Sequence, residues 1–167
     1  MAQVIYPGTF DPITLGHVNI LEKASDIFDE VILAVADYTG KNPMFNLEER
    51  YQLCCEATEH LPRVHVMKFQ GLFVDFARSQ KCHLMIRGMR AVSDFEYELS
   101  LALTNKKLNP EIETIFLVPH LRYMYLSSSM IRQLAELNGP LDDFVPGCVA
   151  KAMKEKYARR KTAKKAG

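Results

Sequence analysis

The first loop of the chain contains side chains that could hold a phosphate group. It reads YPGTFDPITLGH from Tyr6 to His17 and follows an apolar start. Thr14 is the expected N-cap of a helix, which places Gly16 and His17 in the first helical turn. The free amides of a helix N-terminus favour an anion, and a histidine beside them can donate a further hydrogen bond to phosphate oxygens. We interpret this loop as an anion site, although a lone histidine would more simply be an exposed helix residue.

Two later motifs offer the same chemistry. IRGMR places Arg87 and Arg90 around a glycine where a strand should end, and arginine suits bidentate contacts to phosphate. SSSMIR, at 127–132, offers hydroxyls and the amides of another helix start. The simpler alternatives are a surface ion pair for the arginines and an ordinary loop for the serines. Neither GxGxxG nor GxxxxGK[ST] occurs, and no Ser-His-Asp arrangement is evident. The residues alone therefore predict a phosphate-rich ligand, such as a nucleotide.

Five short apolar runs and the segments between them predict the elements that position these motifs. Each run is brief and is followed by loop residues, as expected for a strand buried on both faces. The expected strands are Val4–Tyr6, Val31–Val35, Val64–Phe69, Leu84–Arg87 and Ile115–Val118. Helices are expected after Thr14, after a capping box of Asn46 and Glu49, over Leu72–Ser79, from Asp94 with Phe95, Leu99, Ala102 and Leu103 along one face, from Ser128 or Ser129 to Asn138-Gly139, and over 145–160. The alternation predicts an α/β fold, with a Rossmann-like five-stranded parallel sheet flanked by helices in a single domain that ends in a C-terminal helix.

The unusual residues follow the strands of this predicted sheet. The clusters that follow the five strands, in chain order, are Thr9–His17, Lys41, Gly71–Phe73, Arg87–Arg90 and Pro119–Ser129. Parallel sheets bind ligands at the carboxyl ends of their strands, near the switch in strand order. All five clusters therefore fall on one rim, which predicts a ligand site there.

Composition narrows the class of protein. The 167 residues are 48% hydrophobic and 25% charged, as in ordinary globular domains. No apolar run approaches the ~20 residues of a membrane helix, so we expect a cytoplasmic protein without a membrane partner. The four cysteines show no CxxC pair and are expected to be reduced, and nothing near Cys82-His83 completes a metal site.

Charge is distributed unevenly along the chain. Residues 151–167 hold eight Lys or Arg and one Glu, whereas the first 150 hold 13 Lys or Arg against 19 Asp or Glu. Such a tail could contact nucleic acid. We instead interpret 158–167 as a flexible, solvated end beyond a domain spanning 1–157, and we expect no nucleic-acid partner.

Three of the motifs also carry a resemblance. GTFDPITLGH, IRGMRAVSDFEYE and SSSMIR together resemble the nucleotidyltransferases with an [HT]xGH signature, and specifically the bacterial phosphopantetheine adenylyltransferases. The resemblance extends from Val4 to about Lys156. Thr14 stands where many relatives in the wider superfamily have the first histidine, which favours the adenylyltransferase branch over the cytidylyltransferases. Tyr123 stands where a tryptophan is frequent, and the tail after Lys156 lies outside the resemblance.

The resemblance implies a reaction and a set of roles. ATP and 4′-phosphopantetheine would give 3′-dephospho-coenzyme A and pyrophosphate, the penultimate step of coenzyme A synthesis. The implied catalytic residues are His17 as transition-state stabiliser, acting with the Gly16 amide, and Thr9, Lys41 and Arg90. The implied acceptor site consists of Thr9, Lys41, Phe73, Arg87, Leu101 and Asn105. The implied ATP site consists of Thr9, Phe10, Gly16, His17, Gly88, Met89, Arg90, Glu98, Tyr123, Met124, Tyr125, Leu126, Ser127, Ser128 and Ser129.

The resemblance also implies ligands and an assembly. Mg²⁺ is expected on the phosphates of ATP rather than in a protein carboxylate cage, and Asp11 is expected to be a turn residue. Coenzyme A is implied as a feedback inhibitor, and a homohexamer is implied as the assembly. Two alternatives stay open. One is a nucleotidyltransferase of the same fold with another acceptor, such as nicotinamide mononucleotide or glycerol 3-phosphate. The other is a non-catalytic module that binds nucleotides or nucleic acid.

Overall fold

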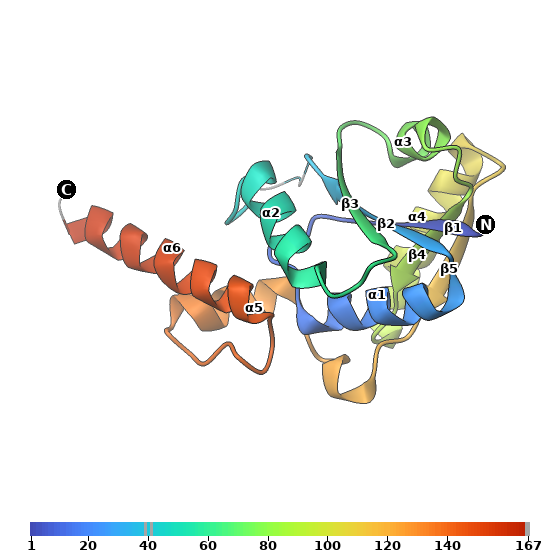
Figure 1. Ribbon diagram of the computed structural model, residues 1–167. Helices are drawn as coiled ribbons and strands as arrows, with labels where there is room; N and C mark the ends of the chain where they lie inside the picture. Colours follow the sequence, from blue (N-terminus) through green and yellow to red (C-terminus); the bar gives the residue numbers. More distant parts are fainter. Residues whose placement is uncertain (39, 41, 166–167) are drawn as a thin grey trace.

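A five-stranded parallel sheet forms the centre of the molecule (Figure 1). The structure is a computed structural model that describes residues 1–38, 40 and 42–165. The strands are β1 (Gln3–Gly8), β2 (Glu30–Ala36), β3 (Val64–Phe69), β4 (Leu84–Gly88) and β5 (Glu113–Leu117), in the spatial order β3-β2-β1-β4-β5. The five predicted strands and the Rossmann-like α/β class are confirmed. The order reverses beside β1, so the carboxyl ends of β1 and β4 flank the switch point where such sheets bind ligands.

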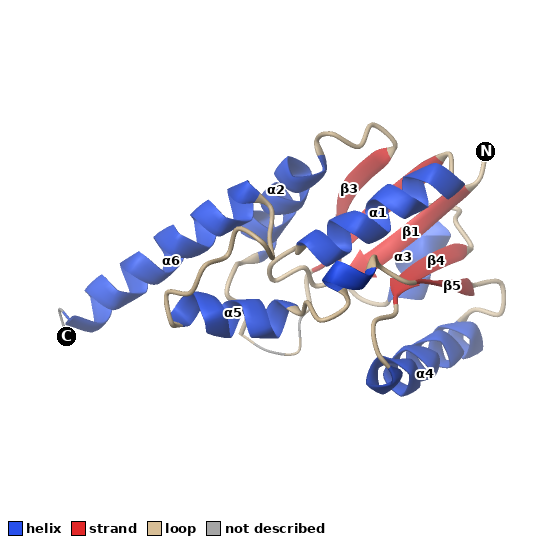
Figure 2. Cartoon of the chain, turned by 90° about the horizontal axis from the view of Figure 1, so that it is seen from below, coloured by secondary structure: helices blue, strands red, loops and turns tan. Residues whose placement is uncertain are grey.

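Helices cover both faces of the sheet (Figure 2). They are α1 (Leu15–Ile27), α2 (Leu47–Thr58), α3 (Phe73–Ser79), α4 (Val92–Leu108), α5 (Ser128–Glu136) and α6 (Gly147–Lys165), with a short 3₁₀ turn η1 (Leu121–Tyr123). Alternate residues of the central strands point to opposite faces. Val31, Leu33 and Val35 of β2 therefore join a core with α1, α2, α5 and α6, whereas Ile32 and Ala34 join a smaller core with α3.

Three predicted helix starts are confirmed, those after Thr14, after Asn46 and at Ser128, whereas α3 begins one residue after the predicted Leu72. The Thr14 hydroxyl accepts a hydrogen bond from the His17 amide, and Asn46 and Glu49 form the expected capping box. Helix α5 begins at Ser128, as predicted. After α5 the chain turns at Asn138, which has φ of +57°, and the Gly139 amide donates to the Leu134 carbonyl.

Helix α4 differs from the prediction in its start and in its orientation. Ala91, not Asp94, occupies the N-cap position, because the Asp94 carboxylate is paired with Arg90 instead of capping the helix. The predicted apolar face points outward, with Phe95, Leu99 and Leu103 exposed by 46%, 37% and 61%.

The face of α4 that packs inward is partly polar. Among the α4 side chains that the structure describes, Glu98 and Asn105 are buried there, with exposures of only 7% and 6%. Both residues line a cavity rather than the apolar core. Glu98 pairs with Arg87 there, and the Asn105 amide donates to the Met85 sulfur.

The C-terminal helix projects from the body (Figure 1). Its first part packs into the main core through Val149, Ala150 and Met153. The Lys156 ammonium lies 2.6 Å from the Glu49 carboxylate on α2, so the contact reaches that position. The helix begins two residues later than predicted and continues past 160 to Lys165. None of the helices described has the length and apolar character needed to cross a membrane.

Candidate active site

A cavity of about 720 Å³ opens at the carboxyl ends of the strands, on the rim where the sequence predicts a ligand site. Its wall includes Gly8, Ala36, Phe69 and Gly88, each the last residue of its strand. Of the predicted site residues, those that line it are Thr9, Phe10, Gly16, His17, Phe73, Arg87, Gly88, Arg90, Glu98, Leu101, Asn105, Leu126, Ser128 and Ser129. The fold thus brings three distant motifs and the inner face of α4 to one place.

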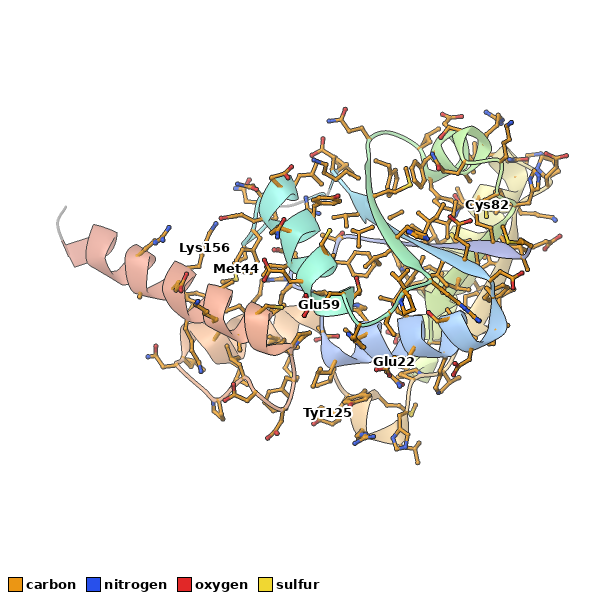
Figure 3. The ribbon with its side chains drawn as sticks, in the orientation of Figure 1. Glu22, Met44, Glu59, Cys82, Tyr125 and Lys156 are labelled. Carbon is orange, nitrogen blue, oxygen red and sulfur yellow. The ribbon has the colours of Figure 1, made fainter. Side chains whose placement is uncertain are left out.

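Other predicted residues lie outside the cavity lining or outside the described chain. Met89, Tyr123, Met124, Tyr125 and Ser127 are not in the wall, and Lys41 lies outside the described residues. Tyr125 sits on the loop that carries η1 (Figure 3), and its ring lies 6.3 Å from that of Phe144. The proposed contacts of these residues with ATP or the acceptor stay predictions.

The turn chemistry of the first loop shapes the cavity wall. Phe10 has φ of +50°, and its buried ring folds back over Gly8. A Cβ at position 8 would lie 2.8 Å from the Phe10 ring, so only glycine fits beneath it. The Phe10 ring then meets the His17 ring edge to face, with 5.1 Å between their centres. The loop therefore holds the Phe10 ring against the His17 ring.

Hydrogen bonds fix which nitrogen of His17 carries the proton. The Thr14 amide donates to Nδ1 of His17 over 3.0 Å, and the His17 amide donates back to the Thr14 hydroxyl over 3.3 Å. In a neutral imidazole that accepts at Nδ1, the proton resides on Nε2. Nε2–H is therefore the group that His17 can offer to a ligand in the cavity.

The surroundings keep this imidazole neutral. Burial lowers the pKa of His17 to about 3, and the positive charges of Arg90 and Arg87 act in the same direction. A histidine with such a pKa cannot exchange protons as an acid or a base near pH 7. It can act there as a fixed hydrogen-bond donor, which suits charge that builds up on an anionic oxygen.

Arg87 forms a two-point ion pair in the cavity wall. Its Nε and Nη2 donate to the two oxygens of Glu98 over 2.7 and 2.8 Å, and its Nη1 donates to the Pro7 carbonyl over 2.7 Å. Burial lowers the pKa of Arg87, but the hydrogen bonds and charge of Glu98 outweigh it and raise the pKa above its usual value. These bonds use three of the five N–H groups of the guanidinium, leaving two for a ligand.

Arg90 connects α4 with the segment before α5. Its guanidinium pairs with Asp94, with 3.1 Å between Nε and Oδ2, and its Nη1 donates to the Leu126 carbonyl. The Ser128 hydroxyl donates to the Pro12 carbonyl over 2.8 Å, which joins the start of α5 to the first loop. The phosphate-binding motifs predicted from sequence are therefore tied to one another through backbone carbonyls.

Sequence reasoning missed two arginines near the cavity. Arg132 closes the SSSMIR motif and lines the cavity, and it donates to the Asp11 carbonyl and lies 3.8 Å from the Asp11 carboxylate. The motif itself could have signalled this residue. Arg50 is buried behind the cavity wall, and its sequence neighbours Glu48 and Glu49 suggest an exposed helix face instead.

The carboxylates that line the cavity are occupied by protein donors. Asp11 accepts hydrogen bonds from the Met44 and Phe45 amides over 2.8 and 2.9 Å, so it fastens the loop before α2. Asp37 accepts from Gln70, and Glu98 holds Arg87. Among the described residues, no three His, Cys, Asp or Glu side chains gather to hold a metal ion.

The comparisons with known proteins agree with this arrangement. A family model described as cytidylyltransferase-like matches residues 5–134, which include the first loop, IRGMR and SSSMIR. The chain belongs to the cytidylyltransferase-like family. The region matched by this cytidylyltransferase-like model includes every residue described as lining the cavity, so the site lies in the part of the chain that defines the family.

Two solved structures are similar to this cytidylyltransferase-like chain. A Vibrio parahaemolyticus protein assigned as a nicotinate-nucleotide adenylyltransferase superposes with a TM-score of 0.71 at 15% identity, over 94% of this chain and 96% of that one. At such identity the likeness shows the fold. A lipopolysaccharide core biosynthesis protein from Thermoplasma volcanium GSS1 superposes with a TM-score of 0.54 at 25% identity, over 72% of this chain and 98% of that one. Family and fold together support nucleotidyl transfer as the general activity.

Proposed function

We propose that this protein transfers the adenylyl group of ATP to 4′-phosphopantetheine, giving 3′-dephospho-coenzyme A and pyrophosphate. The observation that carries the proposal is a neutral histidine that donates from Nε2, set beside Arg87 and Arg90 in a cavity that continues along α4. The resemblance of the three sequence motifs to the phosphopantetheine adenylyltransferases supports the choice of acceptor.

The proposed chemistry needs a donor rather than a base. The nucleophile is an oxygen of the acceptor phosphate, which is already ionised near neutral pH. It attacks the α-phosphorus of ATP, the bond from that phosphorus to the bridging oxygen breaks, and pyrophosphate leaves with the electron pair. Alignment of two anions and stabilisation of the charge on the α-phosphate then account for catalysis. His17, with its low pKa, fits the second task.

The part of the cavity lined by α3 and α4 supports a long, partly apolar acceptor. Phe73 of α3 and Leu101 of α4 contribute apolar surface, and the buried Asn105 amide beside them donates to the Met85 sulfur over 3.7 Å. An amide-containing arm such as pantetheine matches this mixture of apolar wall and amide group. Coenzyme A carries the same arm, and we propose that it competes for this part of the cavity.

We propose that Mg²⁺ reaches the site on the triphosphate of ATP. The lining carboxylates Asp11, Asp37 and Glu98 are engaged by protein donors, so phosphate oxygens and water are the expected ligands. When bound, the ion would neutralise charge on the β and γ phosphates. Arg90 and the serines at the start of α5 would bind the same phosphates.

One assay distinguishes the proposed acceptor from the alternatives. Pyrophosphate release is measured with ATP or CTP and, in turn, with 4′-phosphopantetheine, nicotinamide mononucleotide, nicotinate mononucleotide and glycerol 3-phosphate. We expect turnover with ATP and 4′-phosphopantetheine, with kcat/KM at least about a hundredfold above the other pairs, because the other acceptors lack the long arm. Turnover with another acceptor contradicts the proposed substrate, and binding of ATP without any pyrophosphate release contradicts catalysis.

We propose that the protein assembles as a homohexamer through the outward face of α4. Phe95, Leu99 and Leu103 form an apolar stripe at helical spacing that stays partly exposed in the single chain. Burying such a stripe against other copies removes apolar surface from water. Sedimentation equilibrium should give six times the 19.1 kDa mass of the chain, and Leu103→Glu should lower the assembly state. A monomer at micromolar concentration would contradict the proposal.

A further inference from the structure

Arg50 is a charged residue buried where no ligand can reach it. It lies on α2, is 1% exposed and does not line the cavity. Its guanidinium donates to the carbonyls of Ala36 (2.7 Å), Thr9 (2.8 Å), Phe45 (3.2 Å) and Asp37 (3.4 Å). One side chain thus holds four backbone oxygens from three separate places in the sequence.

These oxygens belong to the two loops that border the cavity beside β1 and β2. Thr9 begins the loop between β1 and α1, whereas Ala36 and Phe45 lie near the two ends of the connection between β2 and α2. Asp11 fastens the same connection from the other side, through the Met44 and Phe45 amides. The two loops are therefore held together by a cation that binds carbonyls and an anion that binds amides.

Only an arginine can fill this position. Burial lowers the pKa of Arg50, while the negative charges of Asp11 and Asp37 oppose the shift. The guanidinium offers five N–H groups in a rigid plane, whereas a lysine ammonium offers three from a single point. Lysine at this site would leave at least one of the four carbonyls without its donor.

The hydrogen bonds of Arg50 lie at one part of the cavity, beside the ends of β1 and β2. It holds the exits of β1 and β2, on the side where Asp37, Asn42 and Pro43 line the cavity. Arg90 and Ser128, where the triphosphate is proposed to bind, form hydrogen bonds with Asp94 and Pro12 and not with the carbonyls that Arg50 holds. A change at Arg50 should therefore disturb one part of the cavity more than the other.

We propose that Arg50 is a positioning residue that holds the backbone at the two described ends of the connection between β2 and α2 against Thr9, in the arrangement that receives the acceptor. It acts through the Thr9 carbonyl and the backbone at Ala36, Asp37 and Phe45. The acceptor meant here is 4′-phosphopantetheine, so this part of the inference rests on the proposed function.

The test uses two variants and a matched control. Arg50→Lys keeps the charge and loses the planar donor set. Arg50→Ala leaves a space that guanidinium chloride, added at low millimolar concentration, can fill. Arg63→Lys is the control, because Arg63 also donates to a backbone carbonyl, that of Ser25 at 2.8 Å, but is exposed just before β3, at the amino end of that strand and outside the cavity lining.

We expect Arg50→Lys to raise KM for the acceptor about tenfold or more, the loss typical of a hydrogen bond to a charged group, with KM for ATP within about twofold. Amide exchange over residues 36–46 should become faster, while exchange in α1 stays unchanged. Guanidinium should restore part of the acceptor affinity of Arg50→Ala, and Arg63→Lys should match the wild type. If Arg50→Ala does not fold, Arg50→Lys still decides the matter.

Other outcomes would overturn the inference. Equal rises in both KM values, or unchanged exchange over 36–46, would leave Arg50 with a role in stability alone. The proposed function can fail separately. If the wild type transfers adenylate to a different acceptor, the same comparison is made with that acceptor, and the exchange measurement does not depend on turnover.

Discussion

Replacing His17 by alanine is expected to lower kcat by about 10²–10³, the typical cost of losing one donor to a developing oxyanion. The KM for ATP should change little, because a donor that acts mainly on transition-state charge contributes little to ground-state binding. The structural basis is the Nε2–H of His17, fixed by the hydrogen bond from the Thr14 amide to Nδ1. Steady-state kinetics on the folded variant give both constants.

His17→Asn is the matched variant, since its amide keeps an N–H donor and should retain more of kcat than alanine does. The capping bond to the Thr14 amide is lost in His17→Ala, so the free energy of unfolding should fall by about 1 kcal/mol without loss of the fold. An increased KM for ATP with kcat unchanged would show that His17 only binds the ground state.

The pKa of His17 gives this prediction a pH dependence. The ring has a pKa of about 3 in the folded protein and 6.5 as the ordinary value, so the unfolded chain binds a proton that the folded chain refuses. The free energy of unfolding should therefore not depend on His17 titration above pH 6.5, and it should fall as the pH drops from 6.5 toward 3. Chemical denaturation across this range should show a weaker pH dependence for His17→Ala. For kcat, we expect no step from His17 protonation between about pH 5 and 8.

Removing the Arg87 guanidinium is expected to weaken 4′-phosphopantetheine by about ten- to a hundredfold and ATP much less, because a hydrogen bond to a charged group is worth ~1.5–3 kcal/mol. Arg87→Ala also leaves Glu98 buried without its cation. The double variant Arg87→Met with Glu98→Gln removes both charges and separates ligand binding from stability. Isothermal titration with each substrate measures the two affinities.

Lys41→Ala should shift the two affinities in the same direction as Arg87→Ala. Lys106→Ala is the control. Lys106 lies on α4, the helix that carries Glu98, and forms an exposed ion pair with Glu113 of β5. Its removal should leave both affinities within about twofold. Equal losses for 4′-phosphopantetheine and ATP in Arg87→Ala would place Arg87 in a shared pocket and overturn the assignment to the acceptor.

Local signals in the sequence predicted most of the framework of this site. The buried strands are continuous apolar runs such as Val31–Val35, and the caps at Thr14 and Asn46 depend on residues three positions apart. Such features involve only neighbouring residues, so a single sequence displays them. The rule for ligand sites in parallel sheets then placed His17 and Arg87 at one rim.

The features that the sequence did not predict depend on long-range contacts. The orientation of α4 is one, since its apolar stripe suggested burial while Glu98 and Asn105 are the residues turned inward. Arg50 is another, because its burial comes from carbonyls up to 41 positions away along the chain. Asp94 is a third. Aspartate is a common N-cap residue, but here its carboxylate pairs with Arg90 and Ala91 occupies the N-cap position.

The capping box at the start of α1 places competing demands on one position. Capping boxes ordinarily carry Glu or Gln at the third helical position, where this chain has His17. A glutamate there would favour the helix but would put a negative charge beside the phosphate that we propose this loop binds. The helix start thus forgoes part of its own stability for the sake of the ligand, a trade-off between stability and activity at a single residue. A screen that selects only for thermal resistance would tend to replace the very side chain on which turnover is proposed to depend.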